Sequence, residues 1–131
     1  MAEAWSLLVV DQTSQLVDVR THAEWRFVGA PELSGIGRKI HFVEWQTFPA
    51  MTQNPDFVTK TSEALGPDKN IPVLFLCRSG GRSQAAAAAM TKAGYTRAYN
   101  IVGGFEGELD GERHRANKNG WKAAGLPWMQ T

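Results

Sequence analysis

The residues best suited to chemistry surround the one cysteine, Cys77, which follows the apolar run Val73-Leu74-Phe75-Leu76. A short loop comes next, and a helical segment begins at its end. A strand, a glycine-containing loop and a helix N-terminus can together direct backbone N–H groups at one point, where they bind an anion. A helix N-terminus and nearby guanidinium groups also favour the thiolate form of a cysteine. The pattern therefore predicts a thiolate nucleophile in an anion-binding loop.

The predicted anion-binding loop consists of Arg78, Ser79, Gly80, Gly81, Arg82 and Ser83. Its arginines supply positive charge, while Gly80 and Gly81 permit positive φ angles and a close approach of the backbone to a ligand. The structural alternative is that Cys77 is an inert, buried thiol at the end of a strand. Two arginines and two glycines beside the cysteine favour the reactive thiol.

Short apolar runs alternate with helical segments along the chain, as in an α/β domain with a mainly parallel sheet. The predicted strands cover residues 16–20, 39–44, 73–76 and 98–102, and the predicted helices cover residues 3–10, 21–28, 54–65, 83–92 and 121–124. Thr21 and Glu24 are expected to form a capping box, and Asn54 to cap the third helix. Residues 106–119 are predicted to form a long surface loop. We expect one domain, residues 1–131, with an open parallel sheet of four to five strands and helices on both faces.

Motifs on both sides of the cysteine extend the pattern over most of the chain. They are Leu16-Val17-Asp18-Val19-Arg20 with Glu24 four residues later, Ile101-Val102-Gly103-Gly104, and Trp121-Lys122-Ala123-Ala124-Gly125-Leu126-Pro127. Together with the Cys77 loop, these segments resemble the rhodanese family of sulfurtransferases. The resemblance implies a rhodanese-like fold in which Cys77 takes sulfane sulfur from a donor such as thiosulfate. A persulfide then passes that sulfur to cyanide or a thiol, without a metal or organic cofactor.

Several other functions share this kind of site. Cysteine-dependent phosphatases place five residues between the cysteine and the arginine of the loop, whereas four lie between Cys77 and Arg82. The same spacing argument applies to arsenate reductases. The shorter loop favours a single sulfur atom over a phosphoryl group, and Arg78 suits the sulfonate of thiosulfate. A noncatalytic binding or regulatory module of the same fold is the alternative from another class. A persulfide relay to a partner protein would use the same site as the free enzyme.

Further residues are expected to support the site rather than react. Asp18 and Arg20 end a strand beside the Cys77 strand. We expect them to form a buried pair that steadies the active loop, as we call residues 77–83, or that supports only the fold. Gly103 and Gly104 are expected to turn the chain tightly beside the active loop, and Trp45 to wall the mouth of the pocket. The three histidines, His22, His41 and His114, are expected to be non-catalytic, and no metal site is indicated.

Charge, apolar runs and cysteine count exclude several classes of protein. The 131 residues carry a formal net charge of +1, which argues against nonspecific nucleic-acid binding. No apolar run approaches the roughly 20 residues that a membrane span needs. The N-terminus lacks the basic region of a secretory signal, and one cysteine excludes an intrachain disulfide. We therefore expect a cytoplasmic protein whose partners are a small-molecule sulfur donor and a thiol or cyanide acceptor, with a protein thiol as an alternative acceptor.

The segment 106–119 separates the Gly103-Gly104 pair from Trp121 and is rich in both charge signs. Members of the rhodanese family place this tryptophan close after the glycine pair. The segment is therefore either a tolerated surface insertion or a lid or docking surface for a protein acceptor.

Overall fold

A computed structural model describes residues 1–131 and has a four-stranded parallel sheet at its centre. The strand order is β3 (Ile40–Phe42), β1 (Gln15–Asp18), β6 (Val73–Leu76) and β7 (Ala98–Asn100). In the register of the sheet, Leu16 lies opposite both Ile40 and Leu74. All strands end at the same edge of a parallel sheet, so β1 and β6 deliver Asp18 and Cys77 to one place.

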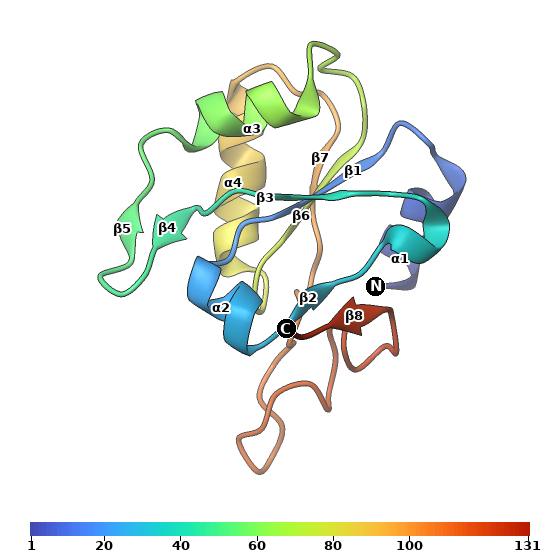
Figure 1. Ribbon diagram of the computed structural model, residues 1–131, viewed down its shortest axis with the longest axis vertical. Coiled ribbons are helices and arrows are strands. Elements are labelled where there is room, and N and C mark those ends of the chain that lie inside the picture. The colour runs from blue at the N-terminus through green and yellow to red at the C-terminus, as the bar shows by residue number, and fades with distance from the viewer.

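Helices cover both faces of the sheet, as the sequence predicts. They are α1 (Ala2–Val10), α2 (His22–Phe27), α3 (Phe57–Leu65) and α4 (Gly81–Lys92), with a short 3-10 helix, η1, at Ser34–Ile36. Figure 1 shows α3 and α4 on one side of the sheet and α1 on the other. None of these helices combines the length and apolarity needed to cross a membrane.

Strand residues alternate between two hydrophobic clusters because successive side chains of a strand point to opposite faces. Val17, Phe75 and Cys77 belong to the cluster beneath α3 and α4. Leu16, Leu74 and Leu76 belong to the other cluster, which contains Leu8 of α1 and the buried Trp121. Residues 73–76 are apolar throughout because both faces of β6 are covered.

Two small strand pairs complete the structure. β2 (Ala30–Pro31) pairs with β8 (Trp128–Met129), which ties the C-terminus beside α2, and β4 (Gln46–Thr47) forms a hairpin with β5 (Thr52–Gln53). These strands are two residues long, too short to show an alternating pattern. No sequence pattern predicts them.

Two helix predictions need correction. Helix α3 begins at Phe57 with Asp56 as its N-cap, not with Asn54. The Asn54 side chain accepts from the backbone N–H of Asp56 and donates to the backbone carbonyl of Glu44, so it builds the turn before the helix. Residues 121–124 form turns rather than a helix. Gly120 and Gly125, with positive φ angles of 99° and 74°, bound this short segment on both sides, and so short a segment cannot offset the cost of helix nucleation.

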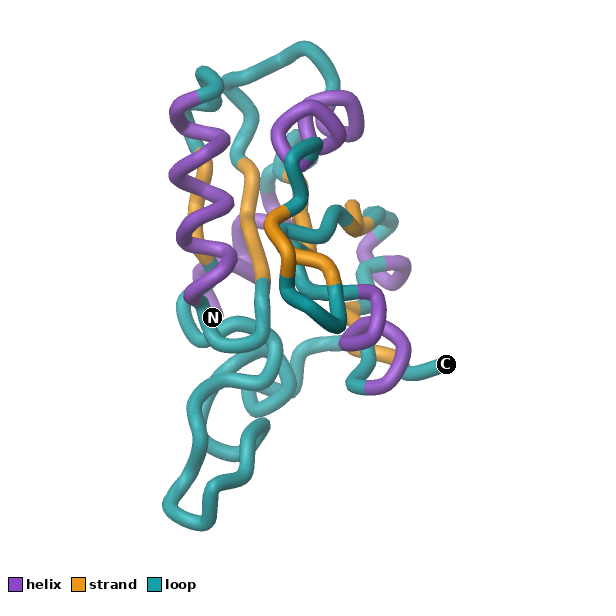
Figure 2. Tube along the Cα trace, turned by 90° about the vertical axis from the view of Figure 1, so that its left-hand side faces the viewer, coloured by secondary structure: helices purple, strands orange, loops and turns teal.

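The capping box and the surface loop agree with the predictions. Thr21 accepts from the backbone N–H of Glu24, whose side chain accepts in return from the backbone N–H of Thr21. Residues 106–119 contain neither helix nor strand. Figure 2 shows this part of the chain as a loop that extends away from the sheet.

Replacing Trp121 by alanine is expected to lower the free energy of unfolding by about 3–5 kcal/mol, as for other buried aromatic side chains. The Trp121 side chain is 0% exposed. Its indole N–H donates to the carbonyl of Pro127 at 2.7 Å. The measurement is urea unfolding, with Trp128→Ala as the control because Trp128 is 41% exposed. Equal losses in the two variants would contradict this account of the core.

Candidate active site

Cys77 lies directly after β6, at the carboxyl edge of the sheet, and is 1% exposed. Its Sγ accepts from the backbone N–H of Gly80 at 3.1 Å and lies 3.2 Å from the hydroxyl oxygen of Ser83. The predicted loop therefore closes around the sulfur and directs polar hydrogens at it. Such donors stabilise a charge on sulfur because they point at the atom that carries it.

The Ser83 hydroxyl also lies within hydrogen-bonding distance of Asn100 Oδ1, at the end of β7. One hydroxyl carries one proton, so it donates either to the sulfur or to the amide oxygen. With a thiolate, the proton of Ser83 points to Sγ. With a thiol, the hydroxyl donates to Asn100. Ser83 and Asn100 thus allow the loop to accommodate both protonation states of Cys77.

Helix α4 begins beside the sulfur. Its N-cap is Gly80, with a φ of 119°, and no side chain caps the first turn. The free N–H groups of a helix N-terminus and its dipole add positive potential where the sulfur lies. Gly80 adopts the positive φ angle that lets its own N–H turn back toward Cys77, and Gly81 starts the helix with an ordinary φ. Ser79 is exposed and completes the loop.

The chain segment after β7 supports the loop from behind. The carbonyl of Cys77 accepts from the N–H of Phe105 at 2.8 Å, and the carbonyl of Arg78 accepts from Glu106 at 2.9 Å and from Gly107 at 3.2 Å. A Cβ on Gly104 would lie 2.5 Å from the Cys77 oxygen, so only glycine permits this approach. Gly104 therefore brings the chain directly against the Cys77 and Arg78 backbone, and Gly103 before it also has a positive φ, 91°.

Arg82 is not free to bind a ligand. Its guanidinium forms two hydrogen bonds with the Glu24 carboxylate, at 2.7 and 2.9 Å, in a largely buried ion pair. Burial acts to raise the pKa of Glu24, but the hydrogen bond and charge of Arg82 outweigh it and lower that pKa. Burial likewise acts to lower the pKa of Arg82, but Glu24 raises it overall, with smaller contributions from Cys77 and Asp18. Arg82 thus fastens α4 to α2, and its charge still acts near the sulfur.

Asp18 and Arg20 form a fully buried ion pair, with 2.7 Å between Oδ2 and Nη2. The same Nη2 donates to the carbonyl of Gly29 at 2.9 Å, and the guanidinium lies 4.2 Å from the centre of the Phe105 ring. Neither side chain hydrogen-bonds to the Cys77 loop. The pair acts on the loop through Phe105, whose backbone N–H holds the Cys77 carbonyl.

An open cleft of about 660 Å³ lies over this loop. Its lining residues come from α2, the β4–β5 hairpin, the active loop and the 106–119 loop: Thr21, Ala23, Glu24, Phe27, Val28, Gln46, Phe48, Met51, Arg78, Arg82, Glu106 and Arg115. Arg78 is exposed and forms no ion pair. Trp45 does not line the cleft, because its ring packs edge-on against Phe57 beside the core, with 5.0 Å between the two ring centres. Its neighbours Gln46 and Phe48 take the position on the wall instead.

Two residues near the site, Asn100 and Arg115, were not predicted from the sequence. Asn100 is a polar residue at the carboxyl end of a strand next to the Cys77 strand, which is a signal that the sequence contains. Arg115 reaches the cleft from a loop without periodicity, and no motif in the neighbouring sequence indicates a role in binding.

The histidines lie away from the sulfur-binding contacts. His41 Nε2 lies 2.9 Å from Gln15 Oε1, and His22 and His114 are exposed. No group of three metal-ligating side chains is present.

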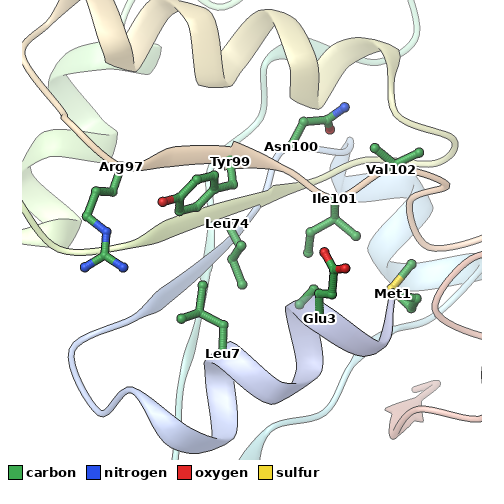
Figure 3. Close-up of a pocket in the computed structure, with 10 residues that line it drawn as sticks. Met1, Glu3, Leu7, Leu74, Arg97, Tyr99, Asn100, Ile101 and Val102 are labelled. Carbon is green, nitrogen blue, oxygen red and sulfur yellow. The ribbon is translucent and has the colours of Figure 1, made fainter.

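A second hollow of about 450 Å³ lies between α1 and the β7 edge of the sheet. Figure 3 shows Leu7 and Leu74 pointing toward each other there, with Glu3 and Arg97 at its borders. No residue of the Cys77–Ser83 loop lines it, whereas Arg78 and Arg82 line the cleft, so this hollow is separate from the cleft over the loop.

Gly104→Ala is expected to displace the Cys77 carbonyl and to lower the free energy of unfolding by at least about 1–3 kcal/mol, the usual cost of overpacking. The alkylation rate of Cys77 by iodoacetamide should change as well, because the loop that encloses the sulfur moves. Gly111→Ala is the control, since an added Cβ there meets nothing within 4 Å. A Gly104→Ala protein with unchanged stability and alkylation would refute this role for the glycine.

Glu24→Gln tests the ion pair with Arg82. Because folding lowers the pKa of Glu24, its stabilising contribution is present above the ordinary value of 4.5 and is lost as pH falls through the lowered folded pKa. We expect the variant to unfold more easily by about 1–3 kcal/mol at neutral pH, with the difference shrinking in acid. Unfolding curves between neutral and acid pH measure this. Glu63→Gln, at an exposed position on α3 without an ion pair, should show no such trend.

Comparisons with known proteins agree with this geometry. A family model described as STR4 middle domain matches residues 1–131. The crystal structure of an M. tuberculosis protein superposes with a TM-score of 0.90 at 49% identity, over 99% of this chain and 94% of that one. An uncharacterized protein of Rickettsia conorii is 37% identical over 97% of this chain and 92% of its own length.

Relatives with descriptive names match at lower identity or over less of the chain. The chloroplastic rhodanese-like domain-containing protein 4 of Arabidopsis thaliana is 28% identical over 97% of this chain, which spans 24% of that protein. The chloroplastic thiosulfate sulfurtransferase 16 of the same plant is 44% identical over 42% of this chain and 44% of its own length. The chain belongs to the STR4 middle domain family and has a rhodanese-like fold.

Proposed function

We propose that this protein transfers sulfane sulfur through a persulfide on Cys77. One observation carries the proposal: the sulfur lies at the N-terminus of α4 and accepts from the Gly80 N–H, with the Ser83 hydroxyl 3.2 Å away. This arrangement stabilises negative charge on one sulfur atom. The same donors serve the thiolate before transfer and the thiolate that is regenerated after it.

The reaction consists of two displacements at sulfur. The Cys77 thiolate attacks the outer sulfur of thiosulfate, the S–S bond of the donor breaks, and sulfite leaves with the bonding electron pair. Cyanide or a thiolate then attacks the outer sulfur of the persulfide, and the electron pair of that bond returns to Cys77. No external oxidant or reductant is needed. Arg78, exposed beside the sulfur, is suited to pair with the sulfonate.

The geometry supports sulfur transfer over phosphatase or arsenate reductase chemistry. Those reactions use the arginine at the end of the loop to bind the oxyanion, and the guanidinium at that position here, Arg82, is already held by Glu24. The relatives named rhodanese-like and thiosulfate sulfurtransferase support the same choice. An intact cysteine, with donors directed at it, argues against a purely noncatalytic module. We place the reaction in the cytoplasm, with a small thiol, cyanide or a protein thiol as the acceptor.

The test is the intact mass of the reduced protein before and after incubation with thiosulfate. We expect a gain of one sulfur atom, reversed by cyanide with formation of thiocyanate and absent in Cys77→Ser. Ser83→Ala should load more slowly, because the thiolate loses one of its two nearby donors. A protein that gains no sulfur, although iodoacetamide still alkylates Cys77, would refute thiosulfate as the donor. A protein that gains none and resists alkylation would favour the binding module.

A further inference from the structure

We propose that Arg115 forms, together with Arg78, an anion subsite at the mouth of the cleft, and that this subsite selects sulfur acceptors that carry a carboxylate beside their thiol. The inference rests on the proposed function and adds the class of acceptor. It also gives the 106–119 loop a role, since this loop supplies Arg115.

The backbone places Arg115 next to the active loop. Its Nη1 donates to the carbonyl of Gly107 at 2.6 Å. The N–H of the same Gly107 donates to the carbonyl of Arg78 at 3.2 Å, and the N–H of Ala116 donates to the carbonyl of Glu106 at 2.7 Å. One glycine therefore connects the guanidinium of Arg115 to the residue that follows the reactive cysteine. Both arginines line the cleft of about 660 Å³.

The charged residues that line the cleft leave Arg78 and Arg115 without an ionic partner. The cleft contains three arginines and two glutamates, and Arg82 is paired with Glu24. Arg78 and Arg115 form no ion pair, and Glu106 is the one remaining carboxylate. An anion that enters the cleft therefore meets two unpaired guanidinium groups against one negative charge. Guanidinium groups bind carboxylates through paired hydrogen bonds.

The size and walls of the cleft indicate a ligand larger than the sulfur donor. Ligand pockets typically measure about 300–1,000 Å³, so an anion as small as thiosulfate leaves most of this cleft empty. Phe27 and Phe48, which are 74% and 63% exposed, supply apolar wall. The cleft thus suits a molecule with a carbon skeleton and an anionic group. A thiol that bears a carboxylate has both features and supplies the nucleophile for the second displacement.

The loop holds Arg115 in place before any ligand binds. Asp110 accepts from the N–H groups of Glu112 and His114, each at 2.9 Å, and from the Asn117 side chain at 3.0 Å. Ala116 adopts a left-handed φ of 68°, which turns the chain directly after Arg115. A side chain on such a pre-shaped loop loses less conformational freedom on binding than one on an unconstrained loop.

In the proposed step, Arg78 and Arg115 bind the carboxylate of the acceptor while its thiol loses a proton to water. The resulting thiolate attacks the outer sulfur of the Cys77 persulfide. The new S–S bond forms on the acceptor, and the electron pair of the old S–S bond returns to Cys77 as thiolate. Arg115 touches the acceptor and not the reacting sulfur, so it determines specificity through acceptor binding.

The test compares three thiols of similar size and different charge as acceptors from the persulfide: 3-mercaptopropionate, 2-mercaptoethanol and cysteamine. For each thiol, the ratio between native protein and Arg115→Gln cancels the intrinsic reactivity of that thiol. We expect the KM for 3-mercaptopropionate to rise about fivefold in the variant, as befits one partly exposed ion pair. The KM should stay unchanged for 2-mercaptoethanol and fall for cysteamine, with kcat little altered.

The chain offers matched controls. Arg113→Gln removes the same charge from the same loop at an exposed residue that does not line the cleft, and it should leave all three thiols unaffected. Arg115→Lys should retain most of the preference. Glu106→Gln should lower the KM for 3-mercaptopropionate. Equal effects of Arg115→Gln and Arg113→Gln, or equal effects on the three thiols, would overturn the inference and favour a protein thiol as the acceptor.

A second readout does not depend on sulfur transfer. Iodoacetate and iodoacetamide alkylate the unloaded Cys77 and differ in carrying or lacking a carboxylate. Arg115→Gln should lower the ratio of the iodoacetate rate to the iodoacetamide rate about fivefold, and Arg113→Gln should not. If thiosulfate loading fails but this ratio falls, the proposed function is wrong and the anion subsite stands. If loading succeeds and the ratio is unchanged, the subsite is wrong and the sulfur chemistry stands.

Discussion

The site depends on the contact between two backbone segments, residues 104–107 and the Cys77–Arg78 carbonyls. Three N–H groups from Phe105, Glu106 and Gly107 donate to these two oxygens, and Gly104 permits the approach because it has no Cβ. Because both carbonyls accept hydrogen bonds from residues 105–107, they point away from the sulfur, and the N–H of Gly80 points toward it. The donors around Cys77 are thus oriented by the peptide groups on the far side of the loop.

Buried charges then fix the elements around this contact. Asp18 and Arg20 join β1 to Gly29 and to the ring of Phe105, and Glu24 joins α2 to Arg82 of α4. Breaking a buried pair by removing one partner is costly, because the other charge remains without compensation. Three arginines near the site thereby divide between two tasks. Arg20 and Arg82 hold the scaffold, and Arg78 remains free at the opening.

The sequence predicted the parts of the structure that short-range chemistry decides. The apolar run 73–76, the Thr21–Glu24 capping box and the glycine loop after Cys77 each have a local cause, and all three lie where they were expected. The partner of Arg82 lies 58 residues away in the chain, and local patterns do not encode such distant pairs. Glu24 appeared as a capping residue and in fact serves both Thr21 and Arg82. The direction of Trp45 and the reach of Arg115 depend on long-range packing in the same way.

The enclosure of Cys77 has a consequence for oxidative damage. A lone reactive thiol commonly ends as a disulfide between two molecules, and such a bond requires two Cα atoms within about 7 Å of each other. Here Cys77 is 1% exposed, with the backbone of Gly80 on one side and of Gly104 on the other. A second folded copy has no room to bring its own sulfur that close. The enclosure of the sulfur therefore disfavours covalent dimerisation of the folded protein.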